Sequence, residues 1–308
     1  MREGRKEGPG DLKTDGMIPR RSLGLDAPPV SAVGYGGMHL SIQDRPDEEQ
    51  GIRVIHAALD AGVTLVDTAD VYCLDHRDIG HNERLVARAL ESWQGDRDDI
   101  IVATKGGITR PSGRWETDAR PQHLRVACER SLQALGVERI DLYQLHAPDP
   151  RVPLAESVGA LAELQQEGKI RWVGLSNVSV FQIREAETVA PITSVQNRLN
   201  PFFREALAEG VVEYCAGRGM GFLAYSPTGG GRLNRKLPAH PVLQPMAARL
   251  GVTPHALALA WVLARSPAVI VIPSARTVEH ARDSTGAAEL VLSDADLSAI
   301  TAAEFSRA

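Results

Sequence analysis

Apolar and polar residues follow two different periods along the chain. Short apolar runs bounded by glycine or polar residues alternate with segments in which apolar residues recur every three or four positions. Runs of the first kind are typical of strands buried on both faces of a parallel sheet, and segments of the second kind are typical of amphipathic helices. The pattern predicts strands at residues 30–35, 63–67, 100–104, 140–145, 171–175, 194–196, 221–225 and 269–272. It predicts helices at residues 47–61, 83–93, 123–135, 154–167, 181–188, 206–218, 254–264, 278–288 and 294–303.

This alternation predicts the fold class. Eight strands, each followed by a helix and with no break in composition, indicate a single α/β domain, a (β/α)8 TIM barrel. Residues 18–23 and 30–33 flank a turn-rich link, which predicts a short strand or hairpin ahead of the barrel, and residues 294–303 predict an extra C-terminal helix. Residues 1–16 are charged and rich in glycine and predict a flexible leader, so the barrel domain is expected to occupy residues 17–308.

The composition narrows the class of partner. The 308 residues carry a net charge of −5, which argues against general nucleic-acid binding, because clustered Lys and Arg carry the affinity for phosphate backbones. No run of about 18 apolar residues occurs, so no membrane span is predicted. Cys73, Cys128 and Cys215 lack the spacing of a zinc site, and they indicate a reducing, cytoplasmic compartment and no metal site. We therefore expect a small-molecule partner, while the oligomeric state stays open.

Four polar residues lie at or just after the ends of predicted strands. Asp67 and Tyr72 follow one strand, Lys105 follows the next, and His146 follows the one after that. Each has an ordinary structural explanation when it is taken alone, such as a turn residue, a packing group or a solvated charge. In a parallel barrel, however, the carboxyl ends of the strands converge on one face, so these side chains are expected to meet there.

Together the four residues make a chemically sensible set. A phenol is a weak acid near neutral pH, but a neighbouring cation favours the tyrosinate that remains after proton donation. Lys105 is positioned to be that cation for Tyr72, with Asp67 holding it in place. His146 is then able to orient a carbonyl oxygen, since either ring nitrogen can donate a hydrogen bond.

From about residue 18 to residue 303 the chain resembles the aldo-keto reductase family. The motifs that carry the resemblance are Gly62-Val-Thr-Leu-Val-Asp67-Thr-Ala-Asp-Val-Tyr72, Ala103-Thr-Lys105-Gly, Asp141-Leu-Tyr-Gln-Leu-His146 and Gly174-Leu-Ser176-Asn177. The resemblance implies that Asp67, Tyr72, Lys105 and His146 form a catalytic tetrad. It further implies hydride transfer from a reduced nicotinamide to an aldehyde or ketone, with Tyr72 as general acid.

The resemblance also implies where the cofactor binds. Nicotinamide contacts are implied for Ser176, Asn177, Gln196 and Tyr225, although a Ser-Asn pair is equally an ordinary turn or cap. Pyrophosphate contacts are implied along the loop that contains Ser226, Pro227, Gly229 and Arg232. Contacts at the adenosine end are implied for Ser274, Arg276, His280 and Ser284. NADPH is expected because an arginine before a helix suits a phosphate, and NADH stays possible because His280 and Ser284 depart from the family pattern.

Two features bear on the substrate. The loop from Cys73 to Asn82 is longer than the family pattern, and it either reshapes the substrate entrance or forms a solvated insertion. Trp115, Phe202 and Phe203 are candidates for an apolar substrate pocket, or alternatively for local packing.

The leading hypothesis is a cytoplasmic, NADPH-dependent carbonyl reductase. One alternative is a cofactor-binding regulatory protein that uses the surface of the barrel to bind a partner, which the intact set of four residues disfavours. Another is a reductase of an activated C=C bond or of a sugar-nucleotide carbonyl on the same fold.

Overall fold

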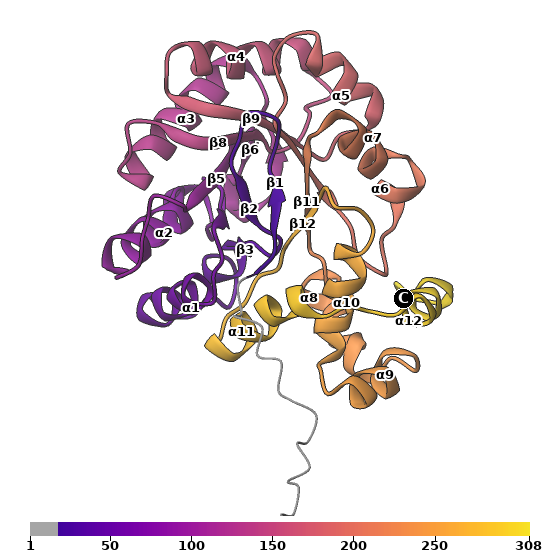
Figure 1. Cartoon of the computed structure of the whole chain (residues 1–308). Coiled ribbons are helices and arrows are strands. Elements are labelled where there is room, and N and C mark those ends of the chain that lie inside the picture. Colours follow the sequence, from indigo (N-terminus) through magenta and orange to yellow (C-terminus); the bar gives the residue numbers. More distant parts are fainter. Residues whose placement is uncertain (1–17) are drawn as a thin grey trace, which may run out of the picture.

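The computed structural model describes residues 18–308, which form a barrel of parallel strands surrounded by helices (Figure 1). The predicted leader at residues 1–16 lies outside the described residues. Neighbouring strands pair in parallel in one eight-stranded sheet, and a parallel bridge between Val33 and Val271 brings its two edges together. In chain order the strands are β3 (Tyr35–Gly36), β4 (Leu65–Asp67), β5 (Ile101–Gly106), β8 (Ile140–Leu145), β9 (Ile170–Ser176), β10 (Ser194–Arg198), β11 (Gly221–Tyr225) and β12 (Val269–Ile272). The predicted TIM barrel is therefore confirmed.

The N-terminal end of the barrel is closed by a hairpin. Strands β1 (Arg20–Ser22) and β2 (Pro29–Ser31) pair antiparallel and lie across the centre of the barrel (Figure 1). Leu23 and Val30 are fully buried against the apolar interior of the barrel, and each contributes about 1.5–3 kcal/mol by that burial. The Trp172 indole donates a hydrogen bond to the main-chain oxygen of Asp26 at 3.1 Å. Because this end is filled, polar side chains inside the barrel gather at the other end.

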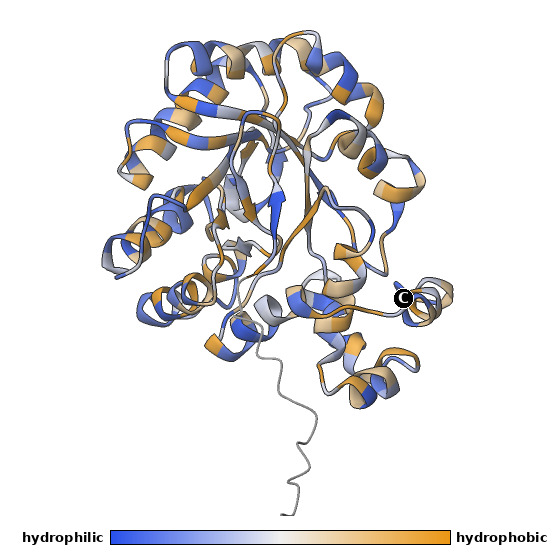
Figure 2. Cartoon of the chain, viewed as in Figure 1, coloured by the Kyte–Doolittle hydropathy of each residue, from blue (hydrophilic) through white to orange (hydrophobic). Residues whose placement is uncertain are grey.

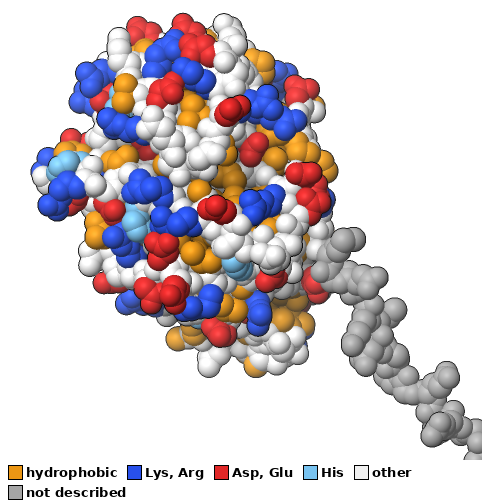
Figure 3. All heavy atoms as spheres, turned by 90° about the vertical axis from the view of Figure 1, so that its left-hand side faces the viewer, with side chains coloured by type: hydrophobic (Ala, Val, Ile, Leu, Met, Phe, Trp, Pro, Cys, Tyr) orange, Lys and Arg blue, Asp and Glu red, His pale blue; other side chains and the backbone are white. Residues whose placement is uncertain are grey.

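Helices cover the outside of the barrel, and most of them are amphipathic, while Pro254–Leu263 is apolar on all sides and buried. Figure 2 shows their apolar sides turned toward the strands and their hydrophilic sides turned outward. Over the face formed by the first three helices, basic and acidic side chains are interspersed (Figure 3). Among residues 18–308 no single helix has the length and apolar composition to cross a membrane, although the two helices Leu243–Leu250 and Pro254–Leu263, joined by a sharp bend, pass that test together. The helices are α1 (Glu48–Asp60), α2 (His81–Ser92), α3 (Pro121–Leu135), α4 (Leu154–Gln166), α5 (Val180–Glu187), α6 (Glu205–Ala208), α7 (Val211–Arg218), α8 (Gly230–Leu233), α9 (Leu243–Leu250), α10 (Pro254–Leu263), α11 (Val278–Gly286) and α12 (Asp294–Ala302).

Three details differ from the predicted elements. The predicted strand at residues 30–35 is divided between β2 and β3. Where β2 ends, the Ser31 N–H donates to the Thr64 hydroxyl at 2.8 Å and the Thr64 N–H donates to the Ser31 hydroxyl at 2.9 Å, in place of a strand ladder. The predicted helix at residues 206–218 is two helices, since Gly210 takes a left-handed φ of 73° between them. The short hairpin of β6 (Ile108–Thr109) and β7 (Glu116–Thr117), and helices α8 and α9, were not predicted.

Candidate active site

Lys105 is the centre of the polar cluster at the carboxyl ends of the strands. It is the fifth residue of β5 and is fully buried. Its Nζ donates hydrogen bonds to Asp67 Oδ2 at 2.6 Å, to the Tyr72 hydroxyl at 3.0 Å and to the main-chain oxygen of Thr68 at 2.8 Å. An ammonium group has three donors, so all of them are used. Lys105 therefore joins the carboxylate and the phenol predicted from the sequence.

The second oxygen of Asp67 is also fully satisfied. Oδ1 accepts hydrogen bonds from the Gln196 amide at 2.7 Å and from the Gln144 amide at 3.2 Å. Gln144 was not among the predicted residues, although it lies two positions before His146 and so faces the same side of its strand. Gly174 leaves room for it, because a Cβ there would lie 2.8 Å from Gln144 Cγ. The buried ion pair thus has the additional hydrogen bonds that a charge in such a site requires.

His146 lies beside the tyrosine. Its ring packs edge-on against Tyr72, with the centroids 5.8 Å apart. Burial and the nearby charge of Lys105 hold the pKa of His146 well below its usual range, so the imidazole is neutral at physiological pH. Its Nδ1 is buried and has no hydrogen-bond partner among residues 18–308. A neutral ring with one protonated nitrogen can donate a hydrogen bond to a carbonyl oxygen.

The charge states of Tyr72 and Lys105 suit proton donation by the phenol. Burial raises the pKa of Tyr72 and Lys105 lowers it, and the net effect is a pKa above the usual value. Burial lowers the pKa of Lys105, but the charge of Asp67 and the contact with Tyr72 outweigh this and leave its pKa raised. Near neutral pH the phenol therefore carries its proton and the amine carries its charge.

The predicted nicotinamide contacts lie at the ends of β9, β10 and β11. The Tyr225 hydroxyl donates to Asn177 Oδ1 at 2.8 Å, and Asn177 Nδ2 donates to the main-chain oxygen of His146 at 3.0 Å. Asn177 takes a left-handed φ of 60° and also contacts the Ser176 hydroxyl at 3.1 Å. The structure therefore places Ser176, Asn177 and Tyr225 together and next to His146, with Gln196 bonded to Asp67.

The loop after β11 turns sharply. Ser226 has a φ of 48°, and its main-chain oxygen accepts a hydrogen bond from Asn200 at 2.8 Å. Pro227 is buried, and Gly229, with a φ of 102°, precedes the short helix α8. Arg232 donates to the main-chain oxygen of Arg307, so the C-terminal segment holds this predicted cofactor residue.

The predicted adenosine contacts surround the start of α11. The Ser274 hydroxyl donates to the main-chain oxygen of Gly36, and the Arg276 guanidinium donates to that of Gln43 at 3.1 Å. His280 lies in the first turn of α11, and Ser284 lies one turn later. These four side chains therefore belong to one end of the barrel, next to the end of β12.

The structure divides the three predicted pocket aromatics. Trp115 lies on the β6–β7 hairpin with its ring centroid 6.4 Å from that of Tyr72, and 46% of its surface is exposed. Phe202 instead packs edge-on against Phe305 at 5.2 Å. Phe203 lies between two guanidinium groups, Arg198 at 3.5 Å and Arg307 at 4.1 Å. Only Trp115 is thus in contact with the tyrosine, while both phenylalanines pack against the C-terminal segment.

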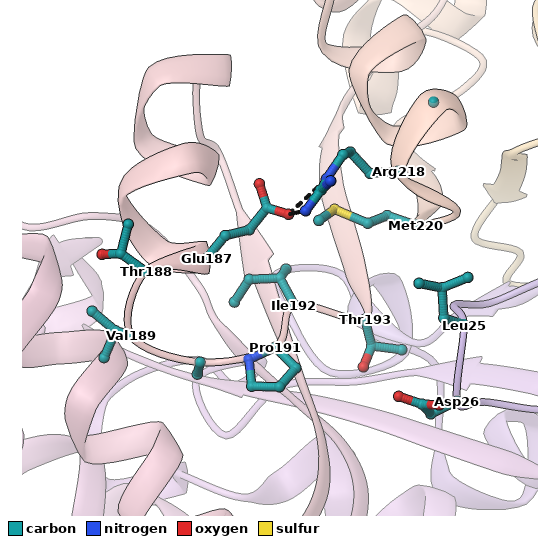
Figure 4. Close-up of a pocket in the computed structure, with 12 residues that line it drawn as sticks. Leu25, Asp26, Glu187, Thr188, Val189, Pro191, Ile192, Thr193, Arg218 and Met220 are labelled. Atoms are coloured by element: carbon teal, nitrogen blue, oxygen red, sulfur yellow. Dashed lines mark hydrogen bonds and ion pairs between the residues drawn. The ribbon is translucent and has the colours of Figure 1, made fainter.

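A hollow of about 440 Å³ lies at the opposite end of the barrel (Figure 4). It is lined by Thr193 and Met220, which directly precede β10 and β11, and by the paired side chains of Glu187 and Arg218. Because those residues lie at the amino ends of the strands, this hollow does not contain the polar cluster around Lys105.

Two further carboxyl groups are buried next to the cluster and were not predicted. Asp70 and Glu83 are 3% and 0% exposed, and Glu83 accepts a hydrogen bond from the hydroxyl of Thr104 at 2.6 Å. Asp70 Oδ1 and Glu83 Oε2 have no partner among residues 18–308. Burial raises the pKa of both groups, and repulsion between them adds to the rise at Asp70. Glu83 lies in the first turn of α2 and Asp70 lies in the loop after β4, and nothing local in the sequence distinguishes either residue from an exposed carboxylate.

We expect Glu83→Gln to stabilise the protein at pH 8 and to have a smaller effect at pH 5, because burial raises the pKa of the Glu83 carboxyl. A carboxyl group whose pKa is higher in the folded protein binds more protons there, so stability falls as pH rises above its unfolded pKa of about 4.3. The amide removes that loss and still accepts from Thr104. Urea unfolding of wild type and variant at pH 5 and pH 8 measures the effect, with the exposed Glu91→Gln on the same helix as control. Parallel stability curves for wild type and Glu83→Gln would contradict the prediction.

Comparison with known proteins now identifies the family. Residues 32–304 match the model of the aldo/keto reductase family. The chain is 36% identical to a probable aldo-keto reductase of Glycine max, over 92% of this chain and 88% of that protein. It is similar to the structure of a glycerol dehydrogenase from Gluconobacter oxydans, with a TM-score of 0.78, 30% identity and coverage of 91% and 93%. It is also similar to an aldo/keto reductase from Klebsiella pneumoniae in complex with NADP and acetate, with a TM-score of 0.78, 28% identity and coverage of 92% and 94%. The chain therefore belongs to the aldo/keto reductase family of oxidoreductases.

Proposed function

We propose that this protein is an NADPH-dependent reductase of aldehydes and ketones in which Tyr72 is the general acid. The observation that carries the proposal is the buried contact of Lys105 Nζ with the Tyr72 hydroxyl at 3.0 Å and with Asp67 at 2.6 Å. This arrangement provides a protonated phenol whose conjugate base would lie against a cation.

The residues divide the reaction between them. Bound NADPH would supply the hydride that the carbonyl carbon accepts. Tyr72 donates its proton to the carbonyl oxygen, and the product is an alcohol. Lys105 stabilises the tyrosinate, and Asp67 keeps the ammonium in place. His146, held neutral by burial, donates a hydrogen bond that orients the oxygen.

The polar groups around the tetrad fit the nicotinamide end of the cofactor. Asn177 is fixed by Tyr225 and by the main chain at His146, which gives the carboxamide a rigid partner. The Gln196 amide nitrogen donates to Asp67, so its oxygen can accept a hydrogen bond from the carboxamide. Tyr225 stands at the end of β11 as the stacking partner for the nicotinamide ring.

The groups around α11 fit a phosphate on the adenosine ribose. Arg276 directly precedes Thr277, the N-cap residue of α11, so the helix dipole and a planar cation can act on the same anion. Two aldo-keto reductase structures from Klebsiella pneumoniae, each 28% identical to this chain, are complexes with NADP and with NADPH, which supports the same choice here. We further propose a small-molecule carbonyl compound as substrate and, from three buried cysteines that are all free, a reducing cytoplasmic location.

The test is turnover with a panel of carbonyl compounds. We expect the purified protein to oxidise NADPH only when an aldehyde or ketone is present and to release the alcohol. The KM for NADPH is expected to be about 10–100 times lower than that for NADH, since hydrogen bonds to a charged group contribute roughly 1.5–3 kcal/mol. Tight NADPH binding without turnover, together with a stable complex recovered from cell extract, would instead indicate a regulatory protein. Products with a reduced C=C bond would indicate the other alternative.

A further inference from the structure

Arg110 is a buried cation near the tetrad, and the proposed reaction gives it no role. It follows β6 and is 7% exposed. Its donors go to main-chain carbonyls instead of to a carboxylate. Nη1 donates to Val71 at 3.4 Å, Nη2 donates to Leu74 at 3.0 Å and to Gly113 at 2.9 Å, and Nε donates to Gly113 at 3.2 Å. A buried guanidinium is costly unless its N–H groups are paired, so these contacts hold it in one orientation.

The three carbonyls come from the two segments that surround the phenol. Val71 and Leu74 flank Tyr72 in the loop after β4, and Gly113 lies in the turn of the β6–β7 hairpin. The two segments also touch directly, because a Cβ at Gly113 would lie 3.3 Å from the main-chain oxygen of Leu74. Arg110 therefore joins the tyrosine loop to the hairpin.

The face of the same guanidinium holds Trp115. Arg110 Cζ lies 3.9 Å from the centroid of the indole, and the indole lies edge-on to Tyr72 at 6.4 Å. Arginine stacks on aromatic rings while its edge makes hydrogen bonds, which a lysine cannot reproduce. A half-exposed ring on a short hairpin would otherwise be free to change rotamer. Ser112 in the same turn takes a left-handed φ of 50°, which is unfavourable for a residue other than glycine and has to be held by its surroundings.

We infer that Arg110 is a positioning residue that fixes Trp115 beside Tyr72 and so favours carbonyl substrates with a flat aromatic substituent. One face of the indole is covered by Arg110, and the indole lies beside Tyr72 with the two ring planes at 66°, so its exposed part forms a wall on which an aryl group can stack. We call Arg110 with these contacts the arginine clamp. The long loop that starts at Cys73 begins within it, because the main-chain oxygen of Leu74 accepts a hydrogen bond from Arg110. The inference about substrates rests on the proposed function of Tyr72.

The test compares an aryl aldehyde, benzaldehyde, with a small one, propanal. We expect Arg110→Met to raise the KM for benzaldehyde about tenfold more than the KM for propanal, with the Kd for NADPH unchanged. Trp115→Ala should give the same selective loss, and the double variant should be no worse than Trp115→Ala alone, because the arginine acts through the indole. Arg110→Lys keeps the buried cation but not the fork, and it should show an intermediate selective loss. Arg114→Met, in the same turn but exposed, is the matched control and should leave both substrates unaffected.

Two results would overturn the inference. One is an equal fall in activity toward both aldehydes, which a merely structural role would produce. The other is additive losses in the double variant. Acrylamide quenching of tryptophan fluorescence, corrected with Trp115→Phe, tests the positioning without any turnover: Arg110→Met and Arg110→Lys should both make Trp115 more accessible. If the wild type showed no reductase activity while quenching still increased in these variants, the proposed function would be rejected, but the arginine clamp would not.

Discussion

Replacing Tyr72 with phenylalanine is expected to lower kcat for carbonyl reduction by about 10²–10⁴-fold, the usual contribution of a positioned proton donor. The substitution removes only the hydroxyl that lies 3.0 Å from Lys105 Nζ. The ring keeps its edge-on contacts with His146 and Trp115, so the shape of the site is preserved. Because kcat and kcat/KM fall together when an interaction of the transition state is lost, steady-state kinetics identifies the effect. The Kd for NADPH should stay within about twofold, since the phenol donates no contact to the cofactor in the proposed arrangement.

Tyr143→Phe is the matched control for that experiment. Tyr143 is as buried as Tyr72, but its hydroxyl makes only a long contact of 3.5 Å with the main-chain oxygen of Leu124. This variant also loses a buried tyrosine hydroxyl, but it should keep its turnover. Full activity of Tyr72→Phe with several aldehydes and ketones would reject Tyr72 as the general acid.

The fold was accessible from the sequence because its signal is periodic and repeated. Each buried strand leaves a short apolar run and each helix leaves an apolar face, and both recur along the whole chain. The β6–β7 hairpin and the break between α6 and α7 escaped prediction because they involve too few residues to show a period. The two strands of the β6–β7 hairpin have two residues each, and the break at Gly210 depends on a single left-handed residue. Their positions depend on contacts between segments that are distant in sequence.

The meeting of the four tetrad side chains was also accessible, because parallel strands end on one face of a barrel. Supporting residues were harder to identify, since nothing local distinguishes them. Gln144 differs from any polar strand residue only through its contact with Asp67, and Arg110 differs from an exposed arginine only through its contacts around Tyr72. Phe202 and Phe203 had the expected residue type and position, but the C-terminal segment draws both rings toward itself. A sequence pattern can place a residue on a face, whereas its partner is decided by tertiary packing.

Lys105→Met is expected to lower the free energy of unfolding by about 3–5 kcal/mol and to abolish measurable turnover. The variant leaves the carboxylate of Asp67, which is 2% exposed, without a counter-charge and with only the amides of Gln144 and Gln196 as donors. Removing one partner of a buried ion pair is costly because the other charge stays desolvated. Turnover is lost for a separate reason, since no cation then supports the tyrosinate at position 72. Urea unfolding and steady-state kinetics on the same preparation measure both effects.

The double variant Lys105→Met with Asp67→Asn separates stability from chemistry. With both charges removed, most of the lost stability should return, because replacing a buried ion pair by neutral groups is often close to neutral in free energy. Turnover should stay absent, because the cation beside Tyr72 is still missing.

As a control, Arg20→Met disrupts an ion pair with Asp99 whose side chains are 44% and 63% exposed, and it should change stability by less than about 1 kcal/mol. If the double variant were as unstable as Lys105→Met, the cost would come from lost packing at position 105; if it recovered turnover, the cation would have no part in catalysis. Only recovery of stability without recovery of turnover supports Lys105 as a group that serves both the fold and the proton transfer.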